Sequence, residues 1–321
     1  MSLGAAHPAE VRIRVPASSA NLGPGYDSFG LALGRYDEVI AEPAESGLDI
    51  VVEGVGAAQV PTDESHLVYQ AACRAWQAMG EPVPGLRMRC VNSIPHGSGQ
   101  GSSAAAIVAG ILMARALTAD GAARLDDAAV FALATEMEGH PDNVAPVLFG
   151  GFTIAWMSRS GGAARAVRSP VHPDIRAVVL TADAACATAT ARAVLPAQVP
   201  HADAASNSAR AALLVHAMAH DPALLLEATE DWLHQRYREG VMPQTAALLD
   251  RLRRSGFAAV LSGAGPSVLL LCTDVPTWST IEQPGFHADE VAIPVDGATV
   301  DGVPFGAPGS RSMLRTAGPH R

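Results

Sequence analysis

The stretch from residue 86 to residue 117 constrains the fold of this chain more than any other. Apolar and polar side chains alternate over residues 86–91, which predicts a β-strand, and residues 104–117 are almost all apolar, which predicts a buried helix. Between them, glycines occupy positions 97, 99 and 101. Glycine lets the backbone turn sharply and come close to a ligand. We therefore expect a strand and a helix joined by a tight loop whose backbone can contact another molecule.

The start of the predicted helix has the features of an anion site. Ser102 and Ser103 are placed to cap the helix or to contact a bound metal. The unpaired N–H groups of the first turn and the positive end of the helix dipole face the same point, so a chain of phosphates is the expected ligand. On this loop alone, an ordinary strand-to-helix turn with a serine cap remains the alternative. The alternating glycines lack the GxGxxG spacing of a dinucleotide-binding loop.

The basic residues limit the chemistry further, because all 22 of them are arginine and the chain contains no lysine. Without lysine, a Schiff base, a Walker A loop and the strand lysine of protein kinases are all excluded. Phosphate chemistry in this chain must therefore rest on arginine, backbone N–H groups and a metal ion.

Composition predicts a globular protein, because 49% of the 321 residues are hydrophobic and only 17% are charged. A net charge of −10 argues against a nucleic-acid partner. The four cysteines are far apart and form no CxxC pair, so we expect reduced thiols. No apolar run reaches the roughly 18 residues of a membrane-spanning helix, and no signal peptide is evident. We therefore expect a cytoplasmic protein with no membrane partner.

Strands and helices are mixed without regular βαβ alternation, which favours an α+β fold. Besides the segments above, we expect strands at 11–15, 36–41, 48–52, 148–157, 175–180, 258–261 and 267–272. Helices are expected at 66–79, 126–138, 185–194, 206–218, 222–233 and 245–255. Loops are expected at 16–25, 139–143 and 158–170, and the last of these marks a domain boundary. This predicts two domains, residues 1–160 and 161–310, followed by a disordered tail over 311–321.

Four segments resemble the motifs of one kinase family. Residues 95–105 (PHGSGQGSSAA) fit the pattern PxxxGxGSSAA, which resembles the phosphate loop of the GHMP kinases (galacto-, homoserine, mevalonate and phosphomevalonate kinases). They depart from the family pattern at Gln100, where leucine or another apolar residue is usual. Residues 16–27 (PASSANLGPGYD) resemble the first family motif, in a wording typical of homoserine kinases, and residues 262–267 (SGAGPS) resemble the third. Residues 138–146 (EGHPDNVAP) resemble a stretch particular to the homoserine kinases.

The resemblance implies a two-domain fold, with an N-terminal domain that holds the nucleotide and much of the substrate site and a ferredoxin-like C-terminal domain. It also implies ATP and Mg²⁺ as cofactors and L-homoserine as the substrate, which is phosphorylated on its hydroxyl group on the route to threonine. The residues expected to bind the nucleotide phosphates are Pro95, His96, Gly97, Ser98, Gly99, Gln100, Gly101, Ser102, Ser103, Ala104, Gly263 and Gly265.

The resemblance also implies a small catalytic set. Ser103 matches the metal-binding serine of the family, and Glu136 matches its acidic metal partner, although Glu138 leaves that alignment open. Asn143 stands at a site where some relatives use aspartate as a base. We expect direct attack by the substrate hydroxyl, with Asp142 as the alternative base.

A second set is expected to hold the amino acid. Asp27 can accept from the ammonium group, and Asn21 can bond to the hydroxyl or backbone of the ligand. His140 is expected to border the same pocket. Arg192 and Arg238 match the carboxylate-binding positions of the family, for which the planar guanidinium fork is suited.

Several points stay open on the sequence alone. A kinase for another small alcohol, such as an isoprenoid precursor, and a non-catalytic ligand-binding protein of the same fold are the alternatives. The contacts to adenine are undefined, because His66 stands at a helix start that usually carries asparagine in the family. The oligomeric state is also open, with a homodimer as one alternative.

Overall fold

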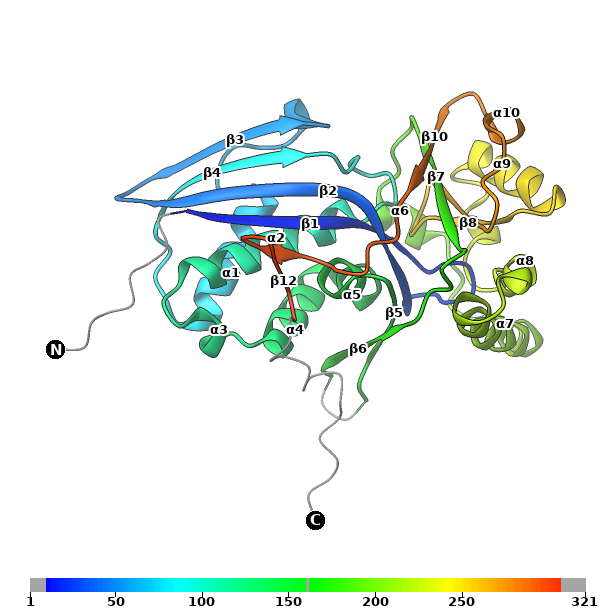
Figure 1. Cartoon of the computed structure of the whole chain (residues 1–321), viewed down its shortest axis with the longest axis horizontal. Helices are drawn as coiled ribbons and strands as arrows, with labels where there is room; N and C mark the ends of the chain where they lie inside the picture. Colours follow the sequence, from blue (N-terminus) through cyan, green and yellow to red (C-terminus); the bar gives the residue numbers. More distant parts are fainter. Residues whose placement is uncertain (1–9, 160–161, 307–321) are drawn as a thin grey trace, which may run out of the picture.

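The chain folds around two β-sheets, and a computed structural model describes residues 10–159 and 162–306 (Figure 1). The strands of the larger sheet are β1 (Val11–Ala20), β2 (Phe29–Ala44), β3 (Leu48–Gly54), β4 (Gly85–Asn92), β5 (Phe152–Met157), β6 (Ala164–Ser169), β11 (Thr299–Val300) and β12 (Val303–Pro304). They follow the order β12-β11-β1-β2-β4-β3, while β5 pairs with β2 and β6 pairs with β5. The predicted strand before the glycine-rich loop is therefore β4, beside the long central strand β2.

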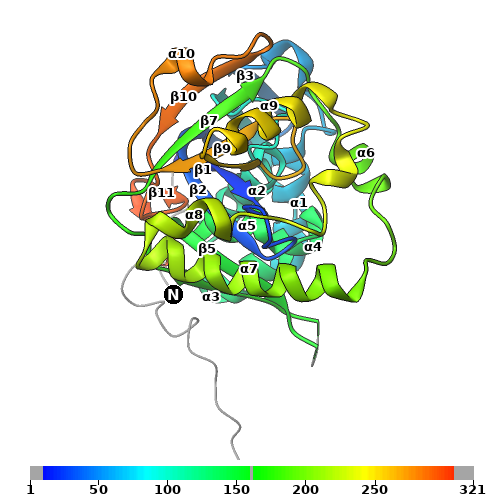
Figure 2. The same cartoon turned by 90° about the vertical axis from the view of Figure 1, so that its right-hand side faces the viewer.

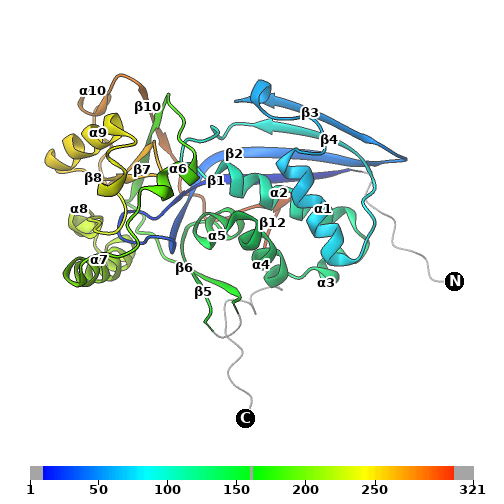
Figure 3. The ribbon, with the colours of Figure 1, turned by 180° about the vertical axis from the view of Figure 1, so that it is seen from behind.

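One face of the larger sheet is covered by helices, as Figures 1 and 3 show from opposite sides. They are α1 (Leu67–Met79), α2 (Ser102–Leu117), α3 (Gly121–Arg124), α4 (Asp127–Glu138) and α5 (Pro141–Phe149), and a short 3₁₀ turn at Ala57–Gln59 precedes them. Helix α2 is buried along most of its length, as its apolar sequence predicts. Helix α1 approaches it closely at Gly110, where a Cβ atom would lie 2.1 Å from the carbonyl oxygen of Val68. The two helices can pack this tightly because glycine has no side chain there.

The smaller sheet contains β7 (Arg176–Ala182), β8 (Ala258–Leu261), β9 (Val268–Cys272) and β10 (Phe286–Val291). Its order, β10-β7-β9-β8, places the first strand between the fourth and the third, and all neighbours are antiparallel. Helices lie between its first and second strands and between its third and fourth, which is the βαββαβ arrangement of a ferredoxin-like domain. The expected α+β fold with a ferredoxin-like C-terminal part is confirmed.

The helices of the C-terminal part lie around this smaller sheet, as the view in Figure 2 shows. They are α6 (Thr188–Ala193), α7 (His201–Ala219), α8 (Leu225–Ala228), α9 (Pro243–Arg254) and α10 (Trp278–Ile281), with 3₁₀ turns at Pro222–Leu224 and Arg236–Arg238. The helix expected over 222–233 is much shorter. The carboxylate of Asp231 accepts hydrogen bonds from the amides of Leu233, His234 and Gln235, so these residues form a turn instead of helix.

Three further expectations from the sequence are corrected. Residues 16–20 were expected in a loop but continue β1, because after a bulge they pair with β2. Residues 141–149 form α5 instead of a turn and a strand start, and Pro141 suits the first turn of a helix because its missing N–H is not needed there. Residues 164–169 form β6 within the expected loop.

The change from one sheet to the other comes later than residue 160. Strand β6 is antiparallel to β5 and still belongs to the larger sheet, so the chain enters the smaller sheet only with β7. After β10 the chain returns to the larger sheet, where β11 pairs with β1. The expected tail over 311–321 lies outside the described residues. Within the residues that are described, none of the helices has the length and apolar character needed to cross a membrane.

Candidate active site

A cavity of about 230 Å³ lies where the two sheets meet, at the open end of α2. Both domains contribute to its wall, and most residues expected from the sequence to bind phosphate or substrate line it. The lining residues among them are Asn21, Gly97, Gly99, Gly101, Ser102, Ser103, His140, Asn143, Arg192, Arg238 and Gly263. Positions up to 242 residues apart in the sequence, such as Asn21 and Gly263, are thereby brought into contact.

Helix α2 presents an uncapped N-terminus to this cavity. The helix begins at Ser102, and Gly101 before it has a left-handed φ of 70°. Among the described residues no side chain caps the helix, so its first-turn N–H groups remain available to an anion. A Cβ atom at Gly101 would lie 2.0 Å from the hydroxyl oxygen of Ser18, which itself donates to Asn143 at 2.9 Å. Only glycine fits at this point.

The loop of residues 262–267 packs against the phosphate loop from the other domain. The Ser262 hydroxyl donates to the carbonyl oxygen of Gly99 at 2.7 Å. A Cβ atom at Gly99 would lie only 2.2 Å from the carbonyl oxygen of Ser262, so the two backbones touch. Gly263 and its neighbour Ala264 line the cavity. Gly265 lies behind the cavity wall, against the side chain of Met242.

Other residues expected to bind phosphate have positions that support the loop. The carbonyl oxygen of Pro95 accepts a hydrogen bond from the Ser98 hydroxyl at 2.8 Å, which closes a turn. His96 lines a neighbouring cavity. Ala104 is buried within α2, and the side chain of Gln100 points toward the domain junction, where it is fully buried.

The acidic residue beside Ser103 is Glu138. The Ser103 hydroxyl donates to the Glu138 carboxylate at 2.8 Å, and both residues line the cavity. Burial raises the pKa of Glu138, although the bond from Ser103 and the nearby His140 oppose this. Glu136, the expected metal partner, lies away from Ser103: its side chain is 66% exposed and pairs with Arg74 at 2.7 Å. Two residues along a helix correspond to a rotation of about 200°, so Glu136 and Glu138 face nearly opposite sides of α4.

Next to this pair, the first turn of α5 holds a buried carboxylate. Asp142 is 1% exposed, and its Oδ1 atom lies 2.6 Å from Nδ1 of His140 and accepts from the amide of Asn143 at 3.0 Å. Although burial acts to lower it, the pKa of His140 is raised by this bond and by the carboxylates of Asp142 and Glu138. Glu138, His140 and Asp142 thus form a polar group on this side of the cavity.

Arg192, which lines the cavity, forms an ion pair with Asp27, which is not among the lining residues. Two hydrogen bonds, of 2.5 and 3.2 Å, join the guanidinium group to the two carboxylate oxygens. Arg192 also donates to the Tyr26 hydroxyl at 2.8 Å. The pair is about one-third exposed, so it is open to exchange with a ligand. Burial and the adjacent Asp27 raise the pKa of Tyr26, which keeps this hydroxyl protonated.

Asn21 shapes the loop that carries Asp27. Its side-chain oxygen accepts from the amide of Asp27 at 3.0 Å, and its side-chain nitrogen donates to the carbonyl oxygen of Gly263 at 2.8 Å. Asn21 and Asp27 both adopt a positive φ, of 70° and 54°, which is uncommon for residues other than glycine. The amide of Asn21 was expected to contact a ligand, but in this structure it fixes the turn that aims Asp27.

Arg238 also lines the cavity and is almost fully buried, with 1% of its surface exposed. Its guanidinium group donates to the carbonyl oxygen of Ala191 at 3.1 Å and contacts Nδ1 of His234 at 2.7 Å. His234 lies 2.8 Å from the carbonyl oxygen of Gly23 through Nε2, so the neutral tautomer with its proton on Nε2 satisfies both bonds. In the described part of the chain, no carboxylate forms an ion pair with Arg238. A buried cation without an anion is costly, so the geometry favours an anionic ligand.

A second cavity, of about 360 Å³, adjoins the first at the N-terminus of α2, and Ser102 and Ser103 line both. Its wall is mostly apolar: Val15, Val39, Val60, Pro61, Leu67, Val68, Ala105, Ala106 and Ala109 all contribute. His66 also lines it, is 3% exposed, and has no hydrogen-bond partner for either ring nitrogen among the described residues. Burial and the nearby His96 lower the pKa of His66, so the ring is neutral and can both donate and accept.

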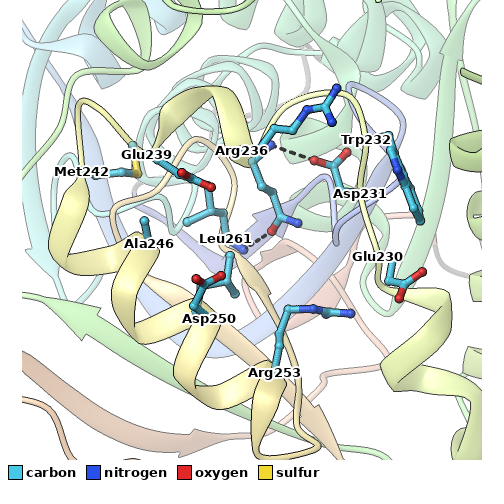
Figure 4. Close-up of a pocket in the computed structure, with 12 residues that line it drawn as sticks. Glu230, Asp231, Trp232, Arg236, Glu239, Met242, Ala246, Asp250, Arg253 and Leu261 are labelled. Carbon is cyan, nitrogen blue, oxygen red and sulfur yellow. Dashed lines mark hydrogen bonds between the residues drawn. The ribbon is translucent and has the colours of Figure 1, made fainter. Parts of the chain in front are cut away.

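A third cavity, of about 270 Å³, lies on the C-terminal domain between residues 230–242 and helix α9 (Figure 4). Its lining mixes carboxylates, arginines and apolar side chains, and the side chain of Gln235 bonds to the amide of Leu261 at 2.7 Å. None of the residues of the glycine-rich loops at 97–101 and 262–267 lines it. Its size is similar to that of the first, but none of the residues expected from the sequence to bind phosphate or substrate lines it.

Sequence reasoning missed several residues of the site. Ser18 lies within the first family motif, but its contact with Asn143 requires the two segments to meet in space. Tyr26 is next to Asp27 and could have been noted from that position. His234 stands four residues before Arg238, a spacing that brings two side chains together in a helical turn. Glu138 was recognised only as an alternative to Glu136.

Comparisons with known proteins agree with this arrangement. Residues 66–151 match the family model described as GHMP kinases N terminal domain, and residues 210–277 match GHMP kinases C terminal. A homoserine kinase of Streptomyces coelicolor is 52% identical over 295 residues, which cover 91% of this chain and 94% of that protein. A homoserine kinase of Mycolicibacterium smegmatis is 51% identical over 261 residues, covering 79% of this chain and 82% of the relative.

Solved structures share the fold. That of a homoserine kinase from Cytophaga hutchinsonii superposes with a TM-score of 0.77 at 24% identity and covers 92% of this chain and 98% of its own. That of a mevalonate diphosphate decarboxylase from Staphylococcus aureus gives a TM-score of 0.64 at 14% identity, with coverages of 91% and 98%. At such identities the likeness concerns the fold alone, whereas the sequence relatives share half of their residues. The chain therefore belongs to the GHMP kinase family, among its homoserine kinases.

Proposed function

We propose that this protein transfers the γ-phosphoryl group of ATP to the side-chain hydroxyl of L-homoserine, which gives ADP and O-phospho-L-homoserine. Relatives named homoserine kinase cover most of the chain at about half identity. The observation that carries the choice of substrate is the charge arrangement of the cavity. Arg238, a buried arginine without an anion, and Arg192, which is paired with the carboxylate of Asp27, both line the cavity that contains the phosphate loop.

The substrate binds by exchange of ion pairs. Without substrate, Asp27 and Arg192 neutralise each other. A zwitterionic amino acid replaces this pair, since its ammonium group can bind Asp27 while its carboxylate binds Arg192 and Arg238. Net charge in the site is unchanged by the exchange, and Arg238 gains the anion that it lacks. Arginine is suited to this role because its planar fork binds a carboxylate through paired hydrogen bonds.

The phosphates of ATP bind at the open N-terminus of α2, where backbone N–H groups and the helix dipole favour negative charge. Ser103 and Glu138 supply a hydroxyl and a carboxylate oxygen side by side, and oxygen donors of this kind suit Mg²⁺. Nowhere in the described residues do three or more His, Cys, Asp or Glu side chains gather to hold a metal ion by themselves. The two protein oxygens would therefore hold the ion together with phosphate oxygens. When bound, Mg²⁺ neutralises the charge of the β- and γ-phosphates.

The adenine ring of the nucleotide occupies the second cavity, because the mostly apolar wall of that cavity begins where the phosphate site ends. A purine ring gains from apolar contact and also needs a few polar partners to fix its orientation. His66 offers both a donor and an acceptor that are otherwise unpaired. This assignment gives a function to the residue whose role the sequence left undefined.

Catalysis rests on position and charge more than on a base. Asp142 is buried and already bonded to His140 and to the amide of Asn143, so it is poorly placed to take a proton from the substrate. His140 borders the cavity, and the carboxylates of Asp142 and Glu138 raise its pKa, which favours the protonated form that stabilises charge on the transferring group. Asn143 and Ser18 hold the glycine loop in its turn. Once it is aligned, the hydroxyl oxygen bonds to the γ-phosphorus while the bond from that phosphorus to the β-phosphate oxygen breaks and ADP leaves. The hydroxyl proton passes to an oxygen of the transferred phosphoryl group.

A coupled assay of ADP release over a panel of amino acids and alcohols tests this proposal. We expect homoserine to be used far better than mevalonate, galactose or homoserine with its carboxylate reduced. Preference for an isoprenoid or sugar alcohol would show that the protein has a different GHMP kinase activity. Binding of homoserine without any ADP release would instead support a non-catalytic ligand-binding role.

A further inference from the structure

Gln100 is the point at which the phosphate loop departs from the family pattern, and the structure gives its polar side chain definite partners. Its side-chain oxygen accepts a hydrogen bond of 2.8 Å from Arg35, and its side-chain nitrogen donates to the Thr181 hydroxyl at 3.0 Å. The residue is 1% exposed. A buried amide with both ends bonded contributes to stability, whereas an apolar residue would remove both of these bonds.

The partners of Gln100 come from both sheets. Arg35 lies on β2 at the bulge opposite Pro16 and Ala17, where two residues of β2 have no partner in β1. A bulge of this kind re-aims the side chains of its strand. Arg35 also donates to Asp289 on β10 at 2.9 Å, and Thr181 lies on the neighbouring strand β7. The side chain of Gln100 is therefore clamped between the long strand of the larger sheet and two strands of the smaller one.

The backbone of the same loop is held from the same side. The carbonyl oxygens of Gly97 and Ser98 accept hydrogen bonds from the amides of Cys186 and Ser267, at 3.0 and 3.3 Å. In a planar trans peptide the next N–H points opposite to the carbonyl. Bonds from the C-terminal domain to the carbonyls therefore orient the following N–H groups, those of Ser98 and Gly99, away from that domain.

Gln100 stands between Gly99 and Gly101, whose φ angles are 79° and 70°. Glycines permit many backbone conformations, so the loop itself does not select one of them. The amide of Ser18 donates to the carbonyl oxygen of Gln100, which fixes the peptide between Gln100 and Gly101. The side chain of Gln100 holds the same residue through its own two hydrogen bonds. Among residues 97–100, Gln100 is the one whose side chain bonds to both sheets in the described structure.

We infer that Gln100, clamped by Arg35 and Thr181, is a positioning residue that sets the orientation of the phosphate-binding backbone by tying it to the junction of the two domains. The inference rests on the proposed role of the loop in binding nucleotide phosphates. It assigns a function to the polar residue that replaces the usual apolar one.

The test compares Gln100→Leu and Thr181→Val, alone and combined, with wild type. We expect Gln100→Leu to raise the KM for ATP about tenfold, because small displacements of positioned groups reduce their effect strongly. The KM for homoserine should change less than about twofold, since the clamp does not touch that part of the cavity. Thr181→Val should have a smaller effect, and the double variant should resemble Gln100→Leu, because both changes break the same bond.

The matched control is Thr118→Val, which also removes one buried side-chain hydrogen bond, to the carbonyl oxygen of Ala114 at the far end of α2. The decrease in melting temperature of Thr118→Val measures the stability lost with one buried hydrogen bond. The KM for ATP of this control then shows how far such a loss of stability alone changes nucleotide binding. The inference is overturned if Gln100→Leu changes the KM for ATP no more than this control, or if the effects of Gln100→Leu and Thr181→Val simply multiply.

A direct titration with ATP analogues separates this inference from the proposed function. If wild type binds nucleotide but does not phosphorylate homoserine, the proposed substrate is wrong, and weaker nucleotide binding by Gln100→Leu still supports the clamp. If wild type binds no nucleotide, both are refuted. If nucleotide affinity is equal in wild type and Gln100→Leu, only the clamp is refuted.

Discussion

The two cavities that meet at the start of α2 differ in how their polar groups are satisfied. In the first, nearly every polar side chain is already bonded to another: Asp27 to Arg192, Ser103 to Glu138, and His140 to Asp142. In the second, the wall is largely apolar and His66 has two ring nitrogens without a partner. The first cavity is a network of charged pairs, whereas the second is a mostly apolar slot in which, among the described residues, His66 has unpaired ring nitrogens.

This difference indicates two modes of binding. In the network, a ligand must replace existing bonds, so specificity comes from matching both charges at once. In the slot, a ligand gains from the burial of apolar surface and from the pairing of one orphaned side chain. Substitutions of the charged residues that line only the first cavity should therefore affect catalysis and substrate choice, whereas substitution of His66 in the second should affect nucleotide affinity alone.

The largest effect is expected at Glu138, in the charge network. Glu138→Gln removes the negative charge next to Ser103, so kcat should fall by about a hundredfold to a thousandfold, as for other groups that act on the transition state. The matched control is Glu136→Gln on the exposed face of the same helix, which should change kcat by less than about twofold. Steady-state kinetics of both variants test this prediction. If kcat falls more in Glu136→Gln than in Glu138→Gln, Glu136 is the metal partner.

A smaller effect is expected for the arginines. Arg238→Ala and Arg192→Ala should each raise the KM for homoserine by about tenfold to a hundredfold, because charged hydrogen bonds contribute roughly 1.5–3 kcal/mol each. The KM for ATP should stay nearly constant. Arg238→Ala also leaves His234 and the carbonyl oxygen of Ala191 without their partner, so circular dichroism must first show a folded variant. An unchanged KM in Arg192→Ala, which lies nearer to solvent, would place the carboxylate elsewhere.

In the second cavity, substitution of His66 should change the affinity for the nucleotide only. His66→Leu keeps the volume but removes both ring nitrogens, so the KM for ATP should rise by about tenfold, the scale of one or two lost hydrogen bonds. His66→Asn is the matched polar variant and should retain more affinity than leucine. Kinetics with each substrate varied separately test this. A change in the KM for homoserine that equals the change for ATP would contradict the separation of the two cavities.

The smallest effect concerns pH and stability. Burial lowers the pKa of His66 below 6.5, the value for an exposed imidazole, so below pH 6.5 the unfolded chain binds a proton that the folded chain does not. Stability must then fall as the pH falls, by at most about 1.4 kcal/mol per pH unit for one proton. His66→Leu lacks this proton-linked loss of stability. Its denaturant midpoint should therefore decrease less between pH 7 and pH 5 than that of wild type. Parallel decreases would show that His66 is protonated in the folded state.

Much of the fold could be predicted because it depends on local sequence. Residues 86–117 were correctly assigned as strand, loop and helix, since alternation, glycines and an apolar run are each strong local signals. The errors came where distant residues decided the outcome. Residues 16–20 became part of β1 because a partner strand was available across a bulge, and the helix expected over 222–233 ended early because Asp231 captured the next amides.

By itself, the sequence determined the type of phosphate site. Three alternating glycines before an apolar helix, in a chain without lysine, leave backbone N–H groups and arginine as the means of binding phosphate. Only the tertiary structure decided which carboxylate faces Ser103, because two residues on one helix differ in direction and not in local pattern. It also decided that Arg238 is buried without an anion and that Gln100 is bonded on both sides. Burial and hydrogen bonding depend on what the rest of the chain packs around a residue, and that information is not local.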